Sequence, residues 1–184
     1  MATINKKGYY PNFNTLKING YSFSLRKFSE VEGHDDSLPY VATLYINNKK
    51  VCLLHNDGWG GETTIVEIYN TKLFKEVENE IKGLPYPSYP WDNDTLLTDA
   101  KITLDKIQEI ADYIAETIVT LNNRIAKYGK KTSIVALQNN KIIHIEFKGK
   151  ELTKEQFDMA EFICKERIKD GWIIINSPTF YKSK

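Results

Sequence analysis

Three turns of two residues each divide much of this chain into pairs of strands. They are Asn19-Gly20, Asn47-Asn48 and Asn139-Asn140. Each turn lies between stretches in which apolar and polar residues alternate, as they do along a strand with one buried face. A type I′ hairpin turn needs a positive φ angle at both central residues, which asparagine and glycine tolerate best. The sequence therefore predicts three antiparallel hairpins.

The turn also predicts the register of the middle hairpin. A two-residue loop at Asn47-Asn48 pairs Ile46 with Lys49, Leu44 with Val51 and Ala42 with Leu53. Two further strands are expected at residues 63–69 and 172–175. The second is apolar on both faces (Trp-Ile-Ile-Ile), so we place it inside the sheet.

Three helices are expected between the strands. The longest runs from Thr103 to Tyr128, where apolar residues recur at alternating spacings of three and four. This stripe fits either a coiled-coil seam or the buried face of a helix lying on a sheet, and Ile110 and Val119 widen it in favour of the sheet. Two shorter helices follow Asn70 and Thr153, which are both suited to cap a helix N-terminus.

This order of elements predicts the fold class α+β: a largely antiparallel sheet built from hairpins, packed against one long and two shorter helices. The 184 residues, 41% of them hydrophobic, are sufficient for one self-supporting core. We expect a single domain over residues 1–184, with a proline- and aromatic-rich linker at 84–102 inside it. Its aromatic part, Leu84–Trp91, is expected to pack partly on the body of the domain.

Charge and cysteine content exclude several classes of protein. The net charge is +1, so no global field indicates a nucleic-acid or membrane partner. Cys52 and Cys164 are too few for a disulfide framework, and both lie in apolar segments, so we expect buried thiols. The first residues lack the apolar stretch of a secretory leader, so we expect a protein of the cytoplasm without a membrane partner. No pattern indicates a cofactor.

The segment between two of the predicted strands is the leading candidate for a binding site. It consists of His55, Asn56, Asp57, Gly58, Trp59, Gly60 and Gly61. Its backbone N–H groups could form a concave site for an anion, and Trp59 could stack on a base or anchor a partner. Alternatively, the segment is a long hairpin connection whose tryptophan lies in the core. Because it leads into a strand, it is neither a P-loop nor a dinucleotide-binding loop.

Charge is distributed unevenly along the chain. Between Glu62 and Asp99 there are eight acidic residues and three lysines, whereas between Arg124 and Lys150 there are seven basic residues and one glutamate. The basic residues at the end of the long helix form a candidate patch for a nucleic acid or a partner: Arg124, Lys127, Lys130 and Lys131. Alternatively, these residues compensate the helix dipole and lie on a solvated rim.

Catalytic patterns are scarce. His34, Asp35 and Asp36, with His55 and Asp57, could in principle gather a divalent metal for hydrolysis. No spacing such as HExxH or HxH supports this interpretation, and the sequence contains no nucleophile elbow. We therefore expect neither an enzyme nor a metal site.

Part of the chain resembles a family of small phage and prophage proteins. The similar residues are Phe28-Ser29-Glu30, the strand and turn Val41–Val51, and the hexapeptide Asn56–Gly61, whose family form is N-D-G-x-G-G. The resemblance extends over about residues 25–150. Such proteins occur among accessory genes of mobile elements, where inhibitors of bacterial defence, including anti-CRISPR proteins, are common.

The resemblance implies a phage accessory protein that binds a host defence complex stoichiometrically, with a Cas9-type nuclease as the expected target. Two alternatives remain open: a protein that sequesters a nucleotide signal at the Gly58–Gly61 loop, and a DNA-binding accessory protein that uses the basic patch. A homodimer through the long helix is also compatible with the sequence.

Overall fold

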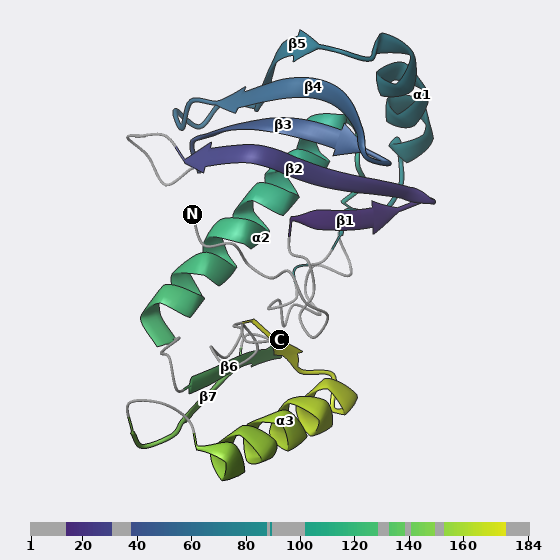
Figure 1. Cartoon of the computed structure of the whole chain (residues 1–184). Helices are drawn as coiled ribbons and strands as arrows, with labels where there is room; N and C mark the ends of the chain where they lie inside the picture. Colours follow the sequence, from purple (N-terminus) through teal and green to yellow (C-terminus); the bar gives the residue numbers. More distant parts are fainter. Residues whose placement is uncertain are drawn as a thin grey trace. The chain divides into compact units, whose positions relative to one another are not determined.

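The structure is a computed structural model of the whole chain (Figure 1). It describes residues 14–30, 38–87, 89, 102–128, 133–138, 141–149 and 153–175. The chain divides into two compact units, one formed by residues 13–87 and 94–119 and the other by residues 1–12, 88–93 and 120–184. We call them the five-stranded unit and the three-stranded unit after their sheets.

The five-stranded unit contains an antiparallel meander in which each strand pairs with the next along the chain (Figure 1). Its strands are β1 (Thr15–Ile18), β2 (Tyr21–Glu30), β3 (Tyr40–Ile46), β4 (Lys49–Asn56) and β5 (Thr64–Ile68). The first two predicted turns are confirmed: φ is 47° at Asn19, 79° at Gly20, 48° at Asn47 and 63° at Asn48. These left-handed angles are the ones that a type I′ turn requires.

The predicted register of the middle hairpin is correct next to the turn and wrong beyond it. Ile46 pairs with Lys49, but Leu44 pairs with Cys52 in place of Val51, and Ala42 pairs with Leu54 in place of Leu53. A β-bulge between Leu44 and Tyr45 causes this shift, because it opposes an extra residue of β4 to β3. As a result Val51 and Cys52, although adjacent in the chain, are both fully buried.

Two helices belong to this unit in whole or in part. Helix α1 (Thr71–Ile81) begins at the predicted cap, where the Asn70 side chain accepts a hydrogen bond from the Leu73 N–H at 3.1 Å. Helix α2 (Ile107–Tyr128) begins four residues after the predicted start at Thr103. Thr103 instead forms a β-bridge with Pro85, which commits its backbone to an extended conformation.

The core of the five-stranded unit lies between the sheet and these helices. Alternate residues of β3 contribute to it: Tyr40, Ala42, Leu44 and Ile46 are at most 1% exposed. From α2 the predicted stripe supplies Ile107, Ile110, Ala111 and Ile114, which are equally buried. Within this unit the stripe is therefore the buried face of a helix that packs on a sheet.

From Leu84 to Pro87 the aromatic linker packs on the same unit, in line with the prediction. The Tyr86 N–H donates to the Ile102 carbonyl at 2.9 Å. The Tyr86 ring meets the Tyr113 ring edge-on, with 6.2 Å between centroids. Leu84 and Pro87 are half-buried.

The three-stranded unit contains β6 (Ser133–Gln138), β7 (Lys141–Glu146), helix α3 (Lys154–Lys169) and β8 (Ile173–Ile174). β6 and β7 form the third predicted hairpin, although its turn residues Asn139 and Asn140 lie outside the described part of the chain. Thr153 and Gln156 cap α3 reciprocally, with hydrogen bonds of 3.0 and 3.3 Å. Ala160 and Cys164 of α3 pack on Ile134, Ala136 and Ile174.

The placement of the last strand inside the sheet is wrong. The order of the three strands is β7-β6-β8, so β6 is the central strand and β8 pairs with it from one side among the described residues. β6 is buried on both faces from Ser133 to Leu137. Ile174 of β8 belongs to the core that packs on α3, and Ile175 after it is also fully buried.

The fold class is α+β, as predicted: antiparallel sheets built from hairpins pack against one long and two shorter helices. The strands belong to two separate sheets. The prediction that all 184 residues form one domain stays a prediction. Within the described residues, no helix is both long enough and apolar enough to cross a bilayer.

Candidate functional site

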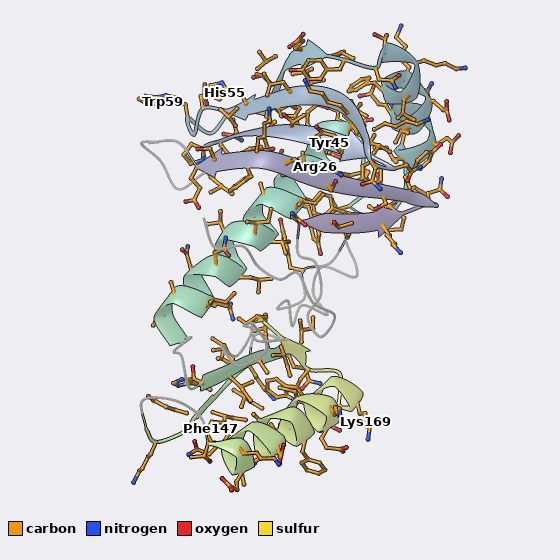
Figure 2. All side chains as sticks on the ribbon, viewed as in Figure 1. Arg26, Tyr45, His55, Trp59, Phe147 and Lys169 are labelled. Carbon is orange, nitrogen blue, oxygen red and sulfur yellow. The ribbon has the colours of Figure 1, made fainter. Side chains whose placement is uncertain are left out.

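The glycine-rich segment connects β4 to β5 at one end of the five-stranded sheet, where Figure 2 shows His55 and Trp59. His55 is half-buried near the end of β4. Trp59 is 64% exposed. The segment joins two paired antiparallel strands, so the interpretation as a long hairpin connection is correct in that respect. Its placement of the tryptophan in the core is wrong.

Side chains of the loop hold its own backbone. Asn56 Oδ1 accepts a hydrogen bond from the Gly58 N–H at 2.9 Å, and Asp57 Oδ1 accepts one from the Trp59 N–H at 3.0 Å. These two contacts are Asx turns, the local geometry that Asn and Asp favour before glycine. Gly58 and Gly60 have φ angles of 77° and 76°, which a residue with a Cβ atom adopts at a cost in strain. The backbone that carries Trp59 is therefore fixed by its own sequence.

A chain of polar contacts fastens this loop to helix α2. The Asn56 side chain donates to the Thr63 hydroxyl at 3.0 Å, and that hydroxyl donates to Asp112 Oδ1. The same carboxylate oxygen accepts from the Tyr40 hydroxyl at 2.8 Å. Thr63 and Tyr40 are 2% and 1% exposed, so both hydroxyl groups are shielded from water. We call Tyr40, Asn56, Thr63 and Asp112 the anchor network.

Burial dominates the electrostatics of the anchor network. It raises the pKa of Asp112, and the hydroxyls of Thr63 and Tyr40 partly oppose this by donating to the carboxylate. Burial also raises the pKa of the Tyr40 phenol, and the negative charge of Asp112 raises it further. The phenol is therefore a hydrogen-bond donor at physiological pH. Nearby in β4, burial raises the pKa of the Cys52 thiol to about 12.

A second contact fastens the far end of the loop. Glu62 forms an ion pair with Lys106, which lies just before α2. This hydrogen-bonded contact raises the pKa of the Lys106 ammonium. Both side chains are largely exposed, so the pair adds little stability.

The hypothesis of an anion site meets an obstacle in this geometry. The N–H groups of Gly58 and Trp59 already donate to oxygens of the loop itself. A phosphate would have to displace the side chains of Asn56 and Asp57, and the Asp57 carboxylate would repel it. What the loop offers outward is the indole ring of Trp59 with open space around Gly60 and Gly61.

The other predicted residues are only partly within the described structure. Arg124 and Lys127 lie on α2, half-buried and exposed respectively, while Lys130 and Lys131 lie outside the described residues. His34, Asp35 and Asp36 also lie outside them. In the part of the chain that is described, no three or more His, Cys, Asp or Glu residues gather in a way that could hold a metal ion.

Sequence analysis missed Tyr40, Thr63 and Asp112. One signal was available: Asp112 stands in the most apolar part of the long helix, between Ala111 and Tyr113, and a carboxylate there needs hydrogen-bond donors. Comparisons of the chain with protein-family models, with curated proteins and with solved structures find no match.

Proposed function

We propose that this protein acts by stoichiometric binding, with the loop His55–Gly61 as its principal contact and Trp59 as the anchor residue. The observation that carries the proposal is the exposure of Trp59, 64%, on a backbone held by two Asx turns and the anchor network. A large aromatic side chain on a prearranged loop loses little conformational entropy on binding. Tryptophan is also among the residues that most often dominate interface energetics.

The proposed partner is a bacterial defence complex of the Cas9 type, and the proposed place of action is the cytoplasm of the bacterial host. The support for this partner is the resemblance of residues 25–150 to phage and prophage proteins. Exposed charge would assist docking: Glu76 and Glu80 lie on α1, and Lys127 lies on α2. Such charges affect recognition and association rate more than affinity.

A titrated DNA-cleavage assay tests this proposal. Purified protein is added to a panel of Cas9-type nucleases loaded with guide RNA, and the cleaved fraction is measured against the ratio of protein to nuclease. We expect inhibition of at least one effector that saturates near one equivalent. Failure against every effector would contradict the proposed partner.

The loop is tested separately by Trp59→Ala. Truncation of an interface tryptophan typically costs 2 kcal/mol or more, so we expect inhibition or binding to weaken at least about 30-fold. Phe162→Ala is the matched control, because Phe162 of α3 is also 64% exposed but lies in the other unit. Equal losses for both variants, or no loss for Trp59→Ala, would show that the loop is not the contact.

A further inference from the structure

The five-stranded sheet has two faces of different character. The inner face is covered by both helices: α2 contacts it where Asp112 meets Tyr40, and α1 where Glu80 accepts from the Tyr21 hydroxyl at 3.0 Å. The outer face carries the alternate residues of each strand. β2 contributes Ser22, Ser24 and Arg26 to this face, and β3 contributes Val41, Thr43 and Tyr45, as the pairing of β2 with β1 and β3 shows.

Cationic and aromatic side chains alternate in a row across this outer face. The Arg26 guanidinium lies over the Tyr45 ring, 4.1 Å from its centroid, and the two are seen together in Figure 2. Tyr45 is the cross-strand partner of Lys50, whose ammonium lies 3.2 Å from the centroid of the Tyr69 ring. The first three residues come from β2, β3 and β4, and Tyr69 directly follows β5. We call them the cation–aromatic row.

Hydrogen bonds fix both ends of the row. Arg26 Nη2 donates to Asn48 Oδ1 at 2.7 Å, which holds the guanidinium plane over Tyr45. The Tyr69 N–H donates to the Val51 carbonyl at 2.8 Å, which keeps Tyr69 beside β4. Arg26 and Lys50 are exposed, and Tyr69 is 37% exposed. The row is thus ordered before any ligand arrives.

The neighbours of the row favour a polyanion that lies flat. Ser22 and Ser24, both half-buried, present short side chains beside it, so a ligand can approach the rings closely. Lys17 pairs with Ser22 and adds a positive charge on the same face. Glu67, opposite Leu53, is the acidic outward residue of β5. Charge on the described outer face is therefore mainly positive.

We propose that the outer face of the five-stranded sheet binds single-stranded nucleic acid along the cation–aromatic row. Because a cation lies over one face of each tyrosine ring, a base stacks on the guanidinium plane of Arg26 or takes the place of the cation on a ring, and phosphates bind the arginine and lysine side chains. Tyr45 and Tyr69 are two strand spacings apart, about 10 Å, so each takes a different base. A duplex keeps its bases stacked inside and leaves the rings unused. An acidic peptide would use Arg26 and Lys50 but not the aromatic rings.

Fluorescence anisotropy with a labelled single-stranded oligonucleotide of about 12 nucleotides tests this site at low salt. We expect the full-length protein to bind it more tightly than the duplex of the same sequence. Tyr45→Ala is expected to weaken binding about tenfold, whereas Tyr45→Phe, which keeps the ring, retains it. Lys75→Ala, on the exposed surface of α1, is the charge control and is expected to have little effect.

Salt dependence tests the phosphate contacts. For single strands, each phosphate contact contributes about −0.7 to the slope of log K against log salt concentration. Arg26→Ala should therefore make this slope less steep by about 0.7. Trp59→Ala should leave oligonucleotide binding unchanged, which separates this site from the proposed partner contact. The proposal would be overturned if the wild type did not bind the oligonucleotide, if it bound the duplex more tightly, or if Lys75→Ala weakened binding as much as Tyr45→Ala. Polyglutamate, used as a competitor, tests for an acidic peptide as the ligand. Full displacement of the oligonucleotide by polyglutamate, together with unimpaired binding by Tyr45→Ala, would also overturn the proposal.

Discussion

Asp112 accepts two hydroxyl hydrogen bonds through a single carboxylate oxygen, and both donors are buried. It is the point at which the loop between β4 and β5 is fastened to α2. The donors reduce the cost of placing a carboxylate among apolar residues, but burial still raises its pKa. Two neighbouring charges of α2, Glu109 and Glu116, raise the pKa further.

Removing the acceptor should destabilise the protein. In Asp112→Ala the hydroxyls of Tyr40 and Thr63 stay buried but lose the carboxylate that accepts from them. We expect this to lower the free energy of unfolding by about 2 kcal/mol. Asp112→Asn keeps the acceptor Oδ1 and should lose clearly less. Urea denaturation followed by circular dichroism measures both variants. A stability of Asp112→Ala equal to that of the wild type would show that the anchor network contributes nothing.

The raised pKa also gives stability a dependence on pH. The pKa of Asp112 in the folded state exceeds its value of about 3.9 in the unfolded state. At a pH between these two pKa values, the folded state therefore binds more protons than the unfolded state. The contribution of Asp112 to stability is therefore present below the unfolded pKa and is lost as the pH rises through the folded pKa. Relative to Asp112→Asn, the wild type should gain stability as the pH falls toward about 4. A difference that stays constant or changes in the opposite direction would contradict the assigned direction.

Some of this site could be predicted from the sequence and some could not. The positive φ angles at Gly58 and Gly60 and the Asx turns follow from local residue types. The contacts of Asp112 join residues 72 and 49 positions away along the chain. Such contacts depend on how β3, β5 and α2 pack, and local sequence carries little information about that.

At the scale of single elements, the N-terminus of α1 provides a direct test of local stabilisation. Asn70→Ala removes the acceptor of the Leu73 N–H and should lower the free energy of unfolding by about 1 kcal/mol. Asn79→Ala is the control, because Asn79 lies exposed in the last turn of the same helix, away from the cap, where alanine improves helix propensity by up to roughly 0.5 kcal/mol. The melting temperature should therefore fall for Asn70→Ala and rise for Asn79→Ala. A shift in the same direction would exclude a capping role for Asn70.

Turns and helix caps were predictable for a different reason from strand positions. A turn or a cap acts through atoms within a few residues, so the residue types alone are sufficient to predict it. The examples are Asn19-Gly20, Asn47-Asn48, Asn70 and the pair Thr153 and Gln156. The bulge at Val51 depends on which residues the core of the five-stranded unit accommodates. The position of β8 at the edge of the described sheet likewise depends on β6 occupying its centre.

At the scale of the whole molecule, each unit contains one buried cysteine: Cys52 in the five-stranded unit and Cys164 in the three-stranded unit. If residues 1–184 unfold as one domain, both thiols should become reactive at the same urea concentration. Thiol labelling with peptide-resolved mass spectrometry measures the two midpoints in one sample. Separate midpoints would contradict the single domain and would rank the stabilities of the two units.

The exposed indole of Trp59 also has a practical consequence. The emission wavelength of tryptophan depends on contact with water, so a partner that covers this ring should shift its emission to shorter wavelength and protect it from acrylamide quenching. The protein therefore carries an intrinsic optical reporter at the surface where we propose that binding occurs. Association could then be followed in real time without attaching a dye.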